Sequence, residues 1–453
     1  MTNKLQGILD AQKARFLTDA TKSCDWRNEQ LDRLERMLRE HRDEFCAALY
    51  QDFRKPPFEQ LFEITVPIGN IRYYRENLKG LMAPQPVAIP KGLEATGNRG
   101  LILKEPYGPT LVIGPFNAPV LLLLDPAIAA LAAGNPVVLK PANTTPATAA
   151  LFQRFVPQYF EPQDVAVVTG GREEIADLLA LPFDFIFFTG SAAVGKIVMR
   201  AAAEHLTPVI LELGGQNPTV VDASANQDIA VDRIAWGHNA ISGQWCVAPG
   251  YVCVHRSIVA EFIARLKLSL RTLYGEDPQR SPDFARMISE HDTRRVASYI
   301  VPDKVVHGGR VDVADRYVEP TVLYPSSWDD PALQQEVFGP VLPVRAYDDL
   351  GEVIGAIKRR PKPLAAYIFS ATRRRSTASW AACPSAEAAS TRPTCTVGST
   401  ACPSAAWGCP AWASTTDGRA STRCPTPRPC WSATRTKCST CFRLTRARTS
   451  RRT

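Results

Sequence analysis

The chain has 453 residues, 45% of them hydrophobic, and a formal net charge of +8. This length allows two or three packed domains of about 100 to 200 residues each. The first ten residues are polar and contain no apolar signal-peptide core, so we expect the protein to be cytoplasmic. The longest apolar stretch, residues 109–139, is interrupted by prolines, Asn117 and Asp125, whereas a membrane span needs about 20 uninterrupted apolar residues. We therefore expect no membrane association.

The positive charge comes entirely from the last part of the chain. Residues 1–371 carry 39 basic and 43 acidic residues, a net charge of −4, whereas residues 372–453 carry 14 basic residues and two acidic ones. This tail holds eight of the twelve cysteines, but it has no isoleucine and a single leucine, Leu444. Such a composition cannot build a hydrophobic core, and we expect the tail to be disordered.

The N-terminal region is predicted to be helical. Apolar residues recur at helical spacing over residues 5–50, with charged residues between them, as in the run 26–40. A proline-bearing segment follows, in which residues 82–90 and 101–104 predict a hairpin-like return. Its prolines suit an edge strand, because proline cannot donate to a sheet ladder.

From residue 100 onward, short apolar strands alternate with helical stretches. This alternation predicts a parallel sheet with crossover helices, a doubly wound arrangement that binds ligands beyond the carboxyl ends of its strands. The expected strands are 111–114, 136–139, 165–168 and 185–188, and the expected helices lie near 125–133, 146–155 and 172–179.

Glu212 and Cys246 supply the two groups that thiol-based oxidation of an aldehyde requires. They stand 34 residues apart, in the glycine-bearing runs 211–218 (LELGGQNP) and 242–249 (SGQWCVAP). A thiolate adds to an aldehyde to form a thiohemiacetal, which can lose hydride to a nicotinamide, and a carboxylate can then activate the water that cleaves the thioester. No metal is needed for this chemistry, and we expect none.

These runs resemble the NAD(P)-dependent aldehyde dehydrogenase family, and within it the shorter class 3-like branch. The resemblance covers roughly residues 10–370, with six motifs in the family's order: 115–119 (PFNAP), 134–141 (GNPVVLKP), 188–196 (FTGSAAVGK), 206–215 (LTPVILELGG), the Cys246 run and 336–340 (EVFGP). It implies an α/β fold with a Rossmann-type cofactor domain, an α/β catalytic domain and a small oligomerisation arm.

The resemblance implies NAD or NADP as cofactor, although no Gly-x-Gly-x-x-Gly fingerprint is present. Gly190, Ser191 and Gly195 stand where a strand gives way to a helix, which favours a pyrophosphate contact, and an ordinary tight turn is the alternative. By resemblance, Lys140 binds the adenosine ribose. Relatives often carry glutamate three residues later, where this chain has Asn143, and because a neutral amide does not repel a 2′-phosphate, we predict that NADP is accepted alongside NAD.

Glu336 and Phe338 resemble the residues that hold the nicotinamide ribose and pack beside it. The alternative is a helix-end charge and a core aromatic residue. Gln216 stands where lysine is often seen, and we expect this change to affect surface charge more than chemistry.

Cys246 is the expected nucleophile because its context is loop-like. Cys24 and Cys46 lie in amphipathic helices and Cys253 in an alternating strand, so these three are expected to be structural, as buried cysteines usually are. Trp245 replaces the threonine or valine expected before the nucleophile, and its bulk narrows the funnel or stacks against a flat substrate.

Asn117 and Glu212 complete the expected catalytic set. By resemblance, the Asn117 amide joins the backbone N–H of Cys246 as an oxyanion donor, and the alternative is a turn asparagine that bonds its own backbone. Glu212 sits among apolar residues, where burial raises the pKa of a carboxyl toward the range of a general base. Its alternative role is to satisfy amides of the Gly214–Gly215 turn.

The tail is best explained as out-of-frame translation of a GC-rich gene. Residues 402–408 (CPSAAWG) can be encoded by bases whose shifted frame reads Leu-Pro-Phe-Gly-Gly-Val-Gly, the glycine-rich run that the family has near its C-terminus. The frame change would lie between about residues 371 and 376. A basic arm, a nucleic-acid element or a zinc element using Cys438 and Cys441 are the other interpretations, and we expect no nucleic-acid partner.

The sequence thus predicts an NAD(P)-binding domain over 1–81 and 105–208, an oligomerisation arm over 82–104, a catalytic domain over 209–371 and the tail over 372–453. We expect oxidation of an aldehyde to the carboxylic acid, with a substituted benzaldehyde as first guess because Trp245, Phe116, Trp236 and His238 suggest an aromatic-lined entrance. The resemblance implies a homodimer if the C-terminus is intact. The alternatives are an inactive frameshifted remnant, a thiol esterase, or an acyl-transferring enzyme that needs coenzyme A.

Overall fold

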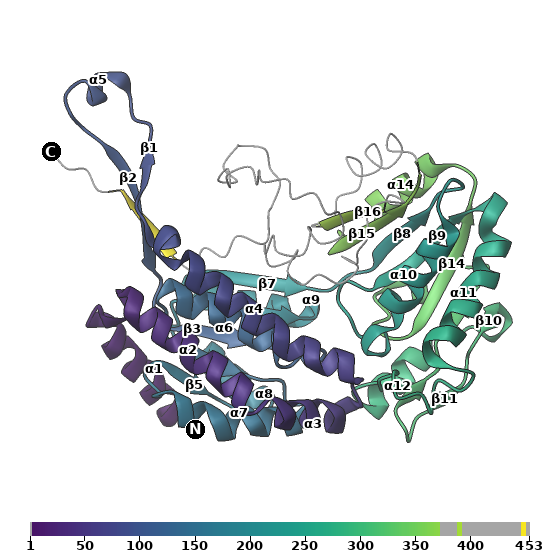
Figure 1. Ribbon diagram of the computed structural model, residues 1–453, viewed down its shortest axis with the longest axis horizontal. Helices are drawn as coiled ribbons and strands as arrows, with labels where there is room; N and C mark the ends of the chain where they lie inside the picture. Colours follow the sequence, from purple (N-terminus) through teal and green to yellow (C-terminus); the bar gives the residue numbers. More distant parts are fainter. Residues whose placement is uncertain (1, 372–386, 392–444, 450–453) are drawn as a thin grey trace. The chain divides into compact units, whose positions relative to one another are not determined.

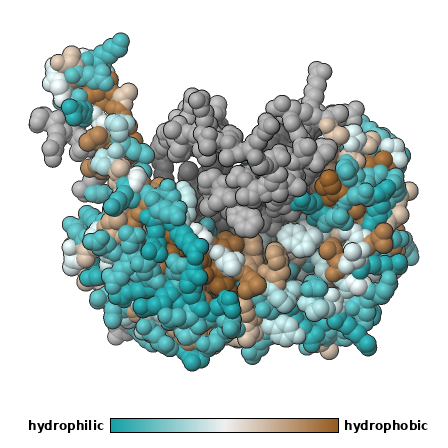
Figure 2. All heavy atoms as spheres, viewed as in Figure 1, coloured by the Kyte–Doolittle hydropathy of each residue, from teal (hydrophilic) through white to brown (hydrophobic). Residues whose placement is uncertain are grey.

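The charged helical pattern of the N-terminal region forms long helices in the computed structural model, which describes residues 2–371, 387–391 and 445–449. In α2 the exposed positions are all charged, whereas Leu31, Leu34 and Leu38 are buried. This alternation confirms the predicted amphipathic helices, and Figure 2 shows hydrophilic side chains across this region. The helices are α1 (Thr2–Leu17), α2 (Cys24–Glu40), α3 (Arg42–Phe53) and α4 (Pro57–Met82).

The chain divides into two compact units (Figure 1). Unit 1 comprises Met1–Asp52, Pro57–Leu213 and Phe442–Thr453, and unit 2 comprises Phe53–Pro56 and Gly214–Cys441. The frame change proposed from the sequence, and nearly all of the tail, lie outside the described residues. Among the residues that the structure describes, no helix is long and apolar enough to cross a membrane.

Unit 1 contains the predicted parallel sheet, whose strands are ordered β5-β4-β3-β6-β7. Hydrophobic residues of the strands and of α1, α8 and α9 form a core cluster on this sheet. The strands are β3 (Thr110–Ile113), β4 (Val137–Lys140), β5 (Val165–Val167), β6 (Phe185–Gly190) and β7 (Val209–Leu213), and the connecting helices are α6 (Leu121–Ala133), α7 (Pro146–Tyr159), α8 (Arg172–Leu179) and α9 (Ala192–Glu204).

A hairpin leaves unit 1 after α4, as the prolines in this segment predicted (Figure 1). β1 (Gln85–Val87) pairs antiparallel with β2 (Gly100–Pro106), and the short helix α5 (Lys91–Glu94) lies between them. The far edge of β2 pairs antiparallel with β17 (Thr445–Thr449).

Unit 2 is built on a seven-stranded sheet ordered β10-β13-β14-β9-β8-β15-β16. All neighbouring pairs are parallel except β10 with β13. The strands are β8 (Asn217–Val221), β9 (Pro249–His255), β10 (Val305–His307), β13 (Thr321–Leu323), β14 (Val341–Tyr347), β15 (Ala365–Phe369) and β16 (Glu387–Thr391), with the small hairpin β11 (Val311–Asp312) and β12 (Tyr317–Val318) beside them. The helices are α10 (Gln227–Asn239), α11 (Val259–Tyr274), α12 (Glu290–Ala297), α13 (Pro331–Gln334) and α14 (Leu350–Lys358).

Both sheets confirm the predicted α/β class. Parallel strands joined by helices are buried on both faces, which is why their sequences are continuous apolar runs rather than alternating ones. β7 pairs with β6, so the structure places residues 209–213 in the sheet of unit 1.

Candidate active site

The candidate residues of unit 1 follow the carboxyl ends of neighbouring strands. The register pairs Ile113 at the end of β3 with Lys140 at the end of β4 and with Phe188 in β6, and it pairs Thr189 with Glu212 in β7. Parallel strands end at one edge of the sheet, so these residues and the loop that carries Asn117 share that edge. The order of the strands reverses at β3, and such a switch point is where doubly wound sheets bind ligands.

Lys140 is held by backbone carbonyls at this edge. Its Nζ donates to the carbonyl oxygens of Pro141 and Gly170, each at 2.8 Å, and its side chain is 1% exposed. Burial lowers the pKa of the Lys140 ammonium, whereas the charge of Glu174 raises it. Asn143 lies near the same loop, with its Nδ2 3.9 Å from the place that a Cβ on Gly171 would take. The ammonium is therefore fixed in position next to one carboxylate, that of Glu174.

The turn from β6 into α9 fits a phosphate group. Ser191 is the N-cap of α9, and its Oγ accepts a hydrogen bond of 3.4 Å from the N–H of Val194. Residues 191–194 are exposed, so the first turn of α9 is accessible to solvent, and a helix N-terminus has N–H groups without an intrahelical partner. A Cβ on Gly195 would lie 2.8 Å from Leu213, which shows that α9 approaches β7 as closely as glycine permits. An open helix N-terminus at the ligand-binding edge suits the pyrophosphate of NAD or NADP.

Glu212 and Asn117 differ in their exposure. Leu211 and Leu213 pack against the core cluster of unit 1, so the side chain of Glu212 points to the opposite face of the sheet, where it is half-buried. Asn117 is 3% exposed and lies in the loop between β3 and α6. The helix that follows is capped by Glu63, whose Oε2 accepts the N–H groups of Val120 and Leu121.

Cys246 lies in unit 2, in a turn just before β9. The N–H of Ala248 donates to the carbonyl of Trp245 at 2.9 Å, which makes Cys246 the second residue of a four-residue turn. Every residue from 237 to 249 is buried except Cys246, which is partly exposed. Cys246 is therefore the one partly exposed residue of an otherwise buried segment.

The remaining described cysteines do not share this setting. Cys24 and Cys46 lie in the helices α2 and α3, as predicted, and both are half-buried. Cys253 is fully buried in β9, and burial raises the pKa of its thiol to about 12. Burial also raises the pKa of the Cys46 thiol, and Asp43 adds to the rise. The Cys46 and Cys253 thiols are therefore poor sources of thiolate at neutral pH.

A left-handed backbone segment precedes the thiol. Ile241, Ser242 and Gly243 have φ values of 54°, 52° and 72°. The left-handed backbone conformation is unusual for a β-branched residue such as Ile241. Strained backbone of this kind is found more often at functional sites.

Gly243 brings the Cys246 run against the Glu336 run. A Cβ on Gly243 would overlap the backbone of Gly339 and lie 2.6 Å from the nitrogen of Pro340. Only glycine fits there, because φ is positive and the approach is close. Two motifs separated by about 90 residues of sequence are thus in contact within unit 2.

Glu336 lies against the glycine pair that follows β7 in sequence. Its carboxylate accepts a hydrogen bond from the N–H of Gly215, and a Cβ on Gly214 would overlap it. Burial raises the pKa of this carboxyl to about 7, although the hydrogen bond and the charge of Arg295 act in the opposite direction. Phe338, two residues on, is half-buried with a φ of 48°.

Gln216, where we expect an effect on surface charge more than on chemistry, also makes hydrogen bonds within unit 2. Its Nε2 donates to the carbonyls of Ala332 at 2.7 Å and Gln335 at 2.6 Å, and its Oε1 accepts from Arg360 at 3.2 Å. The side chain thereby ties the end of the Glu212 run to the segment that leads into Glu336.

His238 also differs from its expected place in an aromatic-lined entrance. It is 3% exposed, and its Nδ1 is 2.8 Å from the carbonyl oxygen of Pro249. Burial lowers the pKa of this imidazole to about 4, so it is neutral at pH 7 and Nδ1 carries the donated proton. Trp245 is 8% exposed, and Trp236 is half-buried.

Sequence reasoning missed the support provided by Gln216 and Gln244. Gln244 is fully buried, and its Nε2 donates to the carbonyls of Ile241 and Arg286 while its Oε1 accepts from the N–H of Ile288, each at 2.9 Å. Both glutamines stand next to glycines inside the quoted motifs. The sequence feature that could have identified both residues is a polar side chain next to a glycine in a functional loop.

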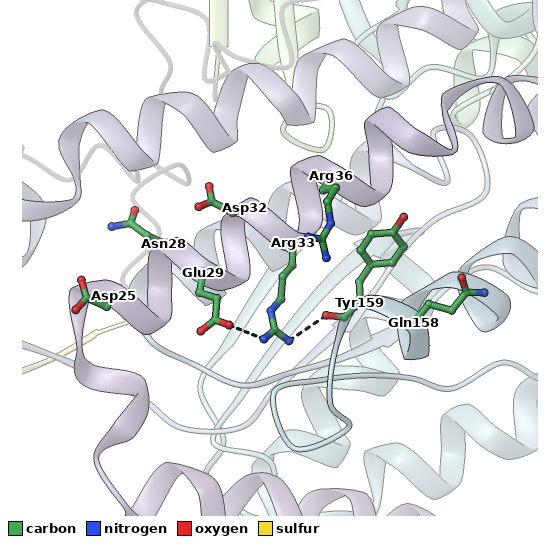
Figure 3. A pocket seen from close by; sticks show the side chains of 8 residues that line it. All are labelled: Asp25, Asn28, Glu29, Asp32, Arg33, Arg36, Gln158 and Tyr159. Atoms are coloured by element: carbon green, nitrogen blue, oxygen red, sulfur yellow. Dashed lines mark hydrogen bonds and ion pairs between the residues drawn. The ribbon is translucent and has the colours of Figure 1, made fainter.

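Unit 1 also has a polar hollow. Figure 3 shows that it is lined by α2 and the end of α7, and that Arg33 bonds both Glu29 and the carbonyl of Tyr159. None of the predicted site residues lines it.

Comparison with known proteins agrees with the fold and the motifs. The model of the aldehyde dehydrogenase family matches residues 4–383. The chain is 41% identical over 361 residues to 4,4′-diaponeurosporen-aldehyde dehydrogenase of Staphylococcus aureus, covering 79% of this chain and 78% of the relative. It is 38% identical to the dimeric NADP-preferring aldehyde dehydrogenase of Canis lupus familiaris, covering 81% of each chain. It is 41% identical over 356 residues to aldehyde dehydrogenase family 3 member B1 of Homo sapiens, covering 78% and 76%.

A solved structure supports the same conclusion. The substrate-bound state of Staphylococcus aureus AldH superposes with a TM-score of 0.83 at 37% identity, covering 85% of each chain. The predicted class 3-like branch is confirmed by the family 3 relative, and NAD or NADP is the cofactor of the family. The chain belongs to the aldehyde dehydrogenase family.

Proposed function

We propose that Cys246 is the nucleophile with which this chain oxidises an aldehyde to the carboxylic acid. The observation that carries this proposal is that Cys246 alone is partly exposed within the buried run 237–249. Its thiolate attacks the aldehyde carbon, and the Asn117 side-chain amide and the Cys246 N–H stabilise the oxyanion. When bound, NAD⁺ or NADP⁺ accepts the hydride. Glu212 then deprotonates the water that cleaves the thioester.

The cofactor-binding residues are proposed in two groups. Lys140 holds the adenosine ribose and Ser191 the pyrophosphate, while Gly190 and Gly195 let the backbone approach. Glu336 holds the nicotinamide ribose, and Phe338 packs beside it. The fixed ammonium of Lys140 and the open N-terminus of α9 support this assignment.

The domain roles follow from the residues that each part carries. We assign NAD(P) binding to residues 1–81 and 105–208, oligomerisation to the arm over 82–104 and catalysis to 209–371. The protruding hairpin of β1 and β2 supports the arm (Figure 1). A cytoplasmic homodimer is the proposed form, and size-exclusion chromatography with light scattering tests the assembly.

Replacing Cys246 tests the chemistry directly. Cys246→Ala should abolish reduction of NAD⁺ or NADP⁺ by an aldehyde and any esterase activity, because no other group forms the acyl link. Cys253→Ala, at a buried thiol in β9, is the matched control and should keep activity. Aldehyde oxidation by Cys246→Ala would reject the assignment. Turnover that requires coenzyme A would instead identify an acyl-transferring enzyme.

A substituted benzaldehyde, such as those formed in vanillin-type or arenesulfonate degradation, is the proposed substrate. Trp245 directly precedes Cys246 in the chain, and a flat ring can stack on an indole. Comparison of kcat/KM for benzaldehydes with that for short aliphatic aldehydes tests this proposal. Equal values for the two classes would reject it.

The composition of residues 372–453 favours a second candidate, an inactive frameshifted remnant of such an enzyme. Sequencing the gene across codons 360–385 tests this alternative. If the one-base change disappears on resequencing, the chain regains the glycine-rich family run and we expect an active enzyme. If the change persists and the protein has no activity, the inactive remnant is supported.

A further inference from the structure

Four consecutive backbone carbonyls, starting with that of Cys246, each accept a hydrogen bond from a side chain of unit 2. Asn217 Nδ2 donates to the carbonyls of Cys246 at 2.9 Å and Ala248 at 2.8 Å. The hydroxyl of Tyr367 donates to the carbonyl of Val247 at 2.5 Å, and His238 Nδ1 lies 2.8 Å from that of Pro249. We call the three donor residues Asn217, Tyr367 and His238 the carbonyl clamp.

The clamp residues come from three separate elements. Asn217 begins β8, Tyr367 lies in the middle of β15, and His238 is near the end of α10. They are 1%, 5% and 3% exposed, so the bonds are shielded from water. The Oδ1 of Asn217 accepts the N–H of Ala365 at 2.8 Å, which fixes the orientation of its amide.

A peptide in this turn cannot rotate without leaving a buried donor and a buried carbonyl unpaired. Such groups are costly in a protein interior because no water replaces the lost bond. On the other side of the thiol, the buried side chain of Gln244 holds the left-handed run Ile241–Gly243. The backbone is therefore restrained on both sides of Cys246, while the residue itself stays partly exposed.

We propose that the carbonyl clamp positions the Cys246 thiol for attack, and that Asn217 and Tyr367 are positioning residues for the reaction. The inference rests on the proposed role of Cys246 as nucleophile. Both residues act through the backbone of residues 246–248 and not by contact with the substrate. They contribute by keeping the thiol in position, because a displacement of about 1 Å in a reacting group can lower the rate about a hundredfold.

Two buried tyrosines of unit 2 provide a matched test. The hydroxyl of Tyr347 donates to the carbonyl of Val221 at 3.4 Å, away from the Cys246 turn, and both Tyr347 and Tyr367 are 5% exposed. We expect Tyr367→Phe to lower kcat about tenfold with a smaller change in KM, and Tyr347→Phe to keep kcat within about twofold. Thermal melting of both variants separates loss of position from loss of fold.

Asn217→Asp tests the clamp by introducing a negative charge while the size and shape of the side chain stay nearly the same. An ionised carboxylate would face the carbonyl oxygens of Cys246 and Ala248, whereas its protonated form can donate one hydrogen bond. We therefore expect kcat to fall about a hundredfold at pH 8, and the ratio of variant to parent to recover as the pH falls. A ratio that does not change with pH would show that ionisation of the new carboxyl is not the cause, and would count against the clamp. If this variant does not fold, the tyrosine pair decides the question.

The rate of Cys246 alkylation by iodoacetamide, followed by peptide mass spectrometry, gives a readout that needs no turnover. Tyr367→Phe and Asn217→Asp should change this rate by about fivefold or more, and Tyr347→Phe should not. If Cys246→Ala is inactive while the clamp variants match the parent in kcat and alkylation rate, the clamp is rejected and the nucleophile stands. If Cys246→Ala keeps full activity, the proposed function fails first. If the parent has no activity, the alkylation rates alone decide.

Discussion

The two units hold their candidate residues at opposite ends of their strands. In unit 1, Lys140 and Glu212 lie at the carboxyl ends of parallel strands, where the sheet ladder and the helix that follows set their positions. In unit 2, Cys246 precedes β9 and Glu336 precedes β14, so both lie at the amino ends of strands. There the connecting segments are irregular, and side chains such as Asn217 and Gln244 bond the backbone in place of a ladder.

This difference shows two ways in which a fold fixes a reactive group. The position of a residue within a strand is set by the backbone hydrogen bonds of the sheet, so replacement of its side chain leaves the fold intact. A residue in a clamped turn depends on the bonds around it, so changes to its neighbours alter chemistry and stability together. The following experiments, ordered by expected effect, test that distinction.

Glu212→Gln should have the largest effect on turnover in unit 1. The amide keeps the β7 ladder but cannot take a proton, so the steady-state rate should fall about a hundredfold to ten-thousandfold. A rapid burst of NAD(P)H equal to the enzyme concentration should remain, because the acyl-forming step of the proposed mechanism does not use this base. Glu204→Gln, at the exposed end of α9, is the control. Loss of the burst in Glu212→Gln would show that the residue acts before acylation.

Gly243→Ala should damage both fold and chemistry in unit 2. A Cβ there has no space against Gly339 and Pro340, and overpacking typically costs about 1–3 kcal/mol. Gly275→Ala is the matched control, since Gly275 has a similar φ of 80° but nothing within 4 Å of a Cβ. Both the free energy of unfolding, measured by urea denaturation, and kcat should be lower for Gly243→Ala than for Gly275→Ala. Equal losses would show that the positive φ, rather than the contact with the Glu336 run, matters.

The raised pKa of Glu336 predicts that the free energy of unfolding depends on pH. Its pKa is raised from 4.5 to about 7, so the folded protein holds this proton more tightly than the unfolded chain does. Stability should therefore fall as the pH rises from about 4.5 to about 7 and level off above that range. Glu336→Gln removes this contribution, which amounts to at most about 3 kcal/mol. Denaturation at pH 5 and pH 8 checks it, and an unchanged pH dependence would contradict the assignment.

Cofactor preference should show the smallest change. Asn143→Glu places a carboxylate near the loop that holds Lys140, and it should lower kcat/KM for NADP about tenfold relative to NAD, about 1.4 kcal/mol. The parent should accept both cofactors. A parent preference for NAD above about a thousandfold, some 4 kcal/mol, would reject the role given to Asn143. Glu173→Gln, at an exposed position of α8, controls for a change in surface charge.

The amino-acid sequence by itself determined the helical N-terminal region, the β3 to β6 strands and the hairpin, because hydrophobic period and proline position are local properties of the chain. It also determined the family, through six motifs in order, and with it the expected site residues. What only the tertiary structure decided is how the thiol turn is supported. Asn217 and Tyr367 are separated from Cys246 by 29 and 121 positions, and Gly243 meets Gly339 across a similar gap. Such bonds depend on how strands are ordered in a sheet, and no local pattern in the sequence records that order.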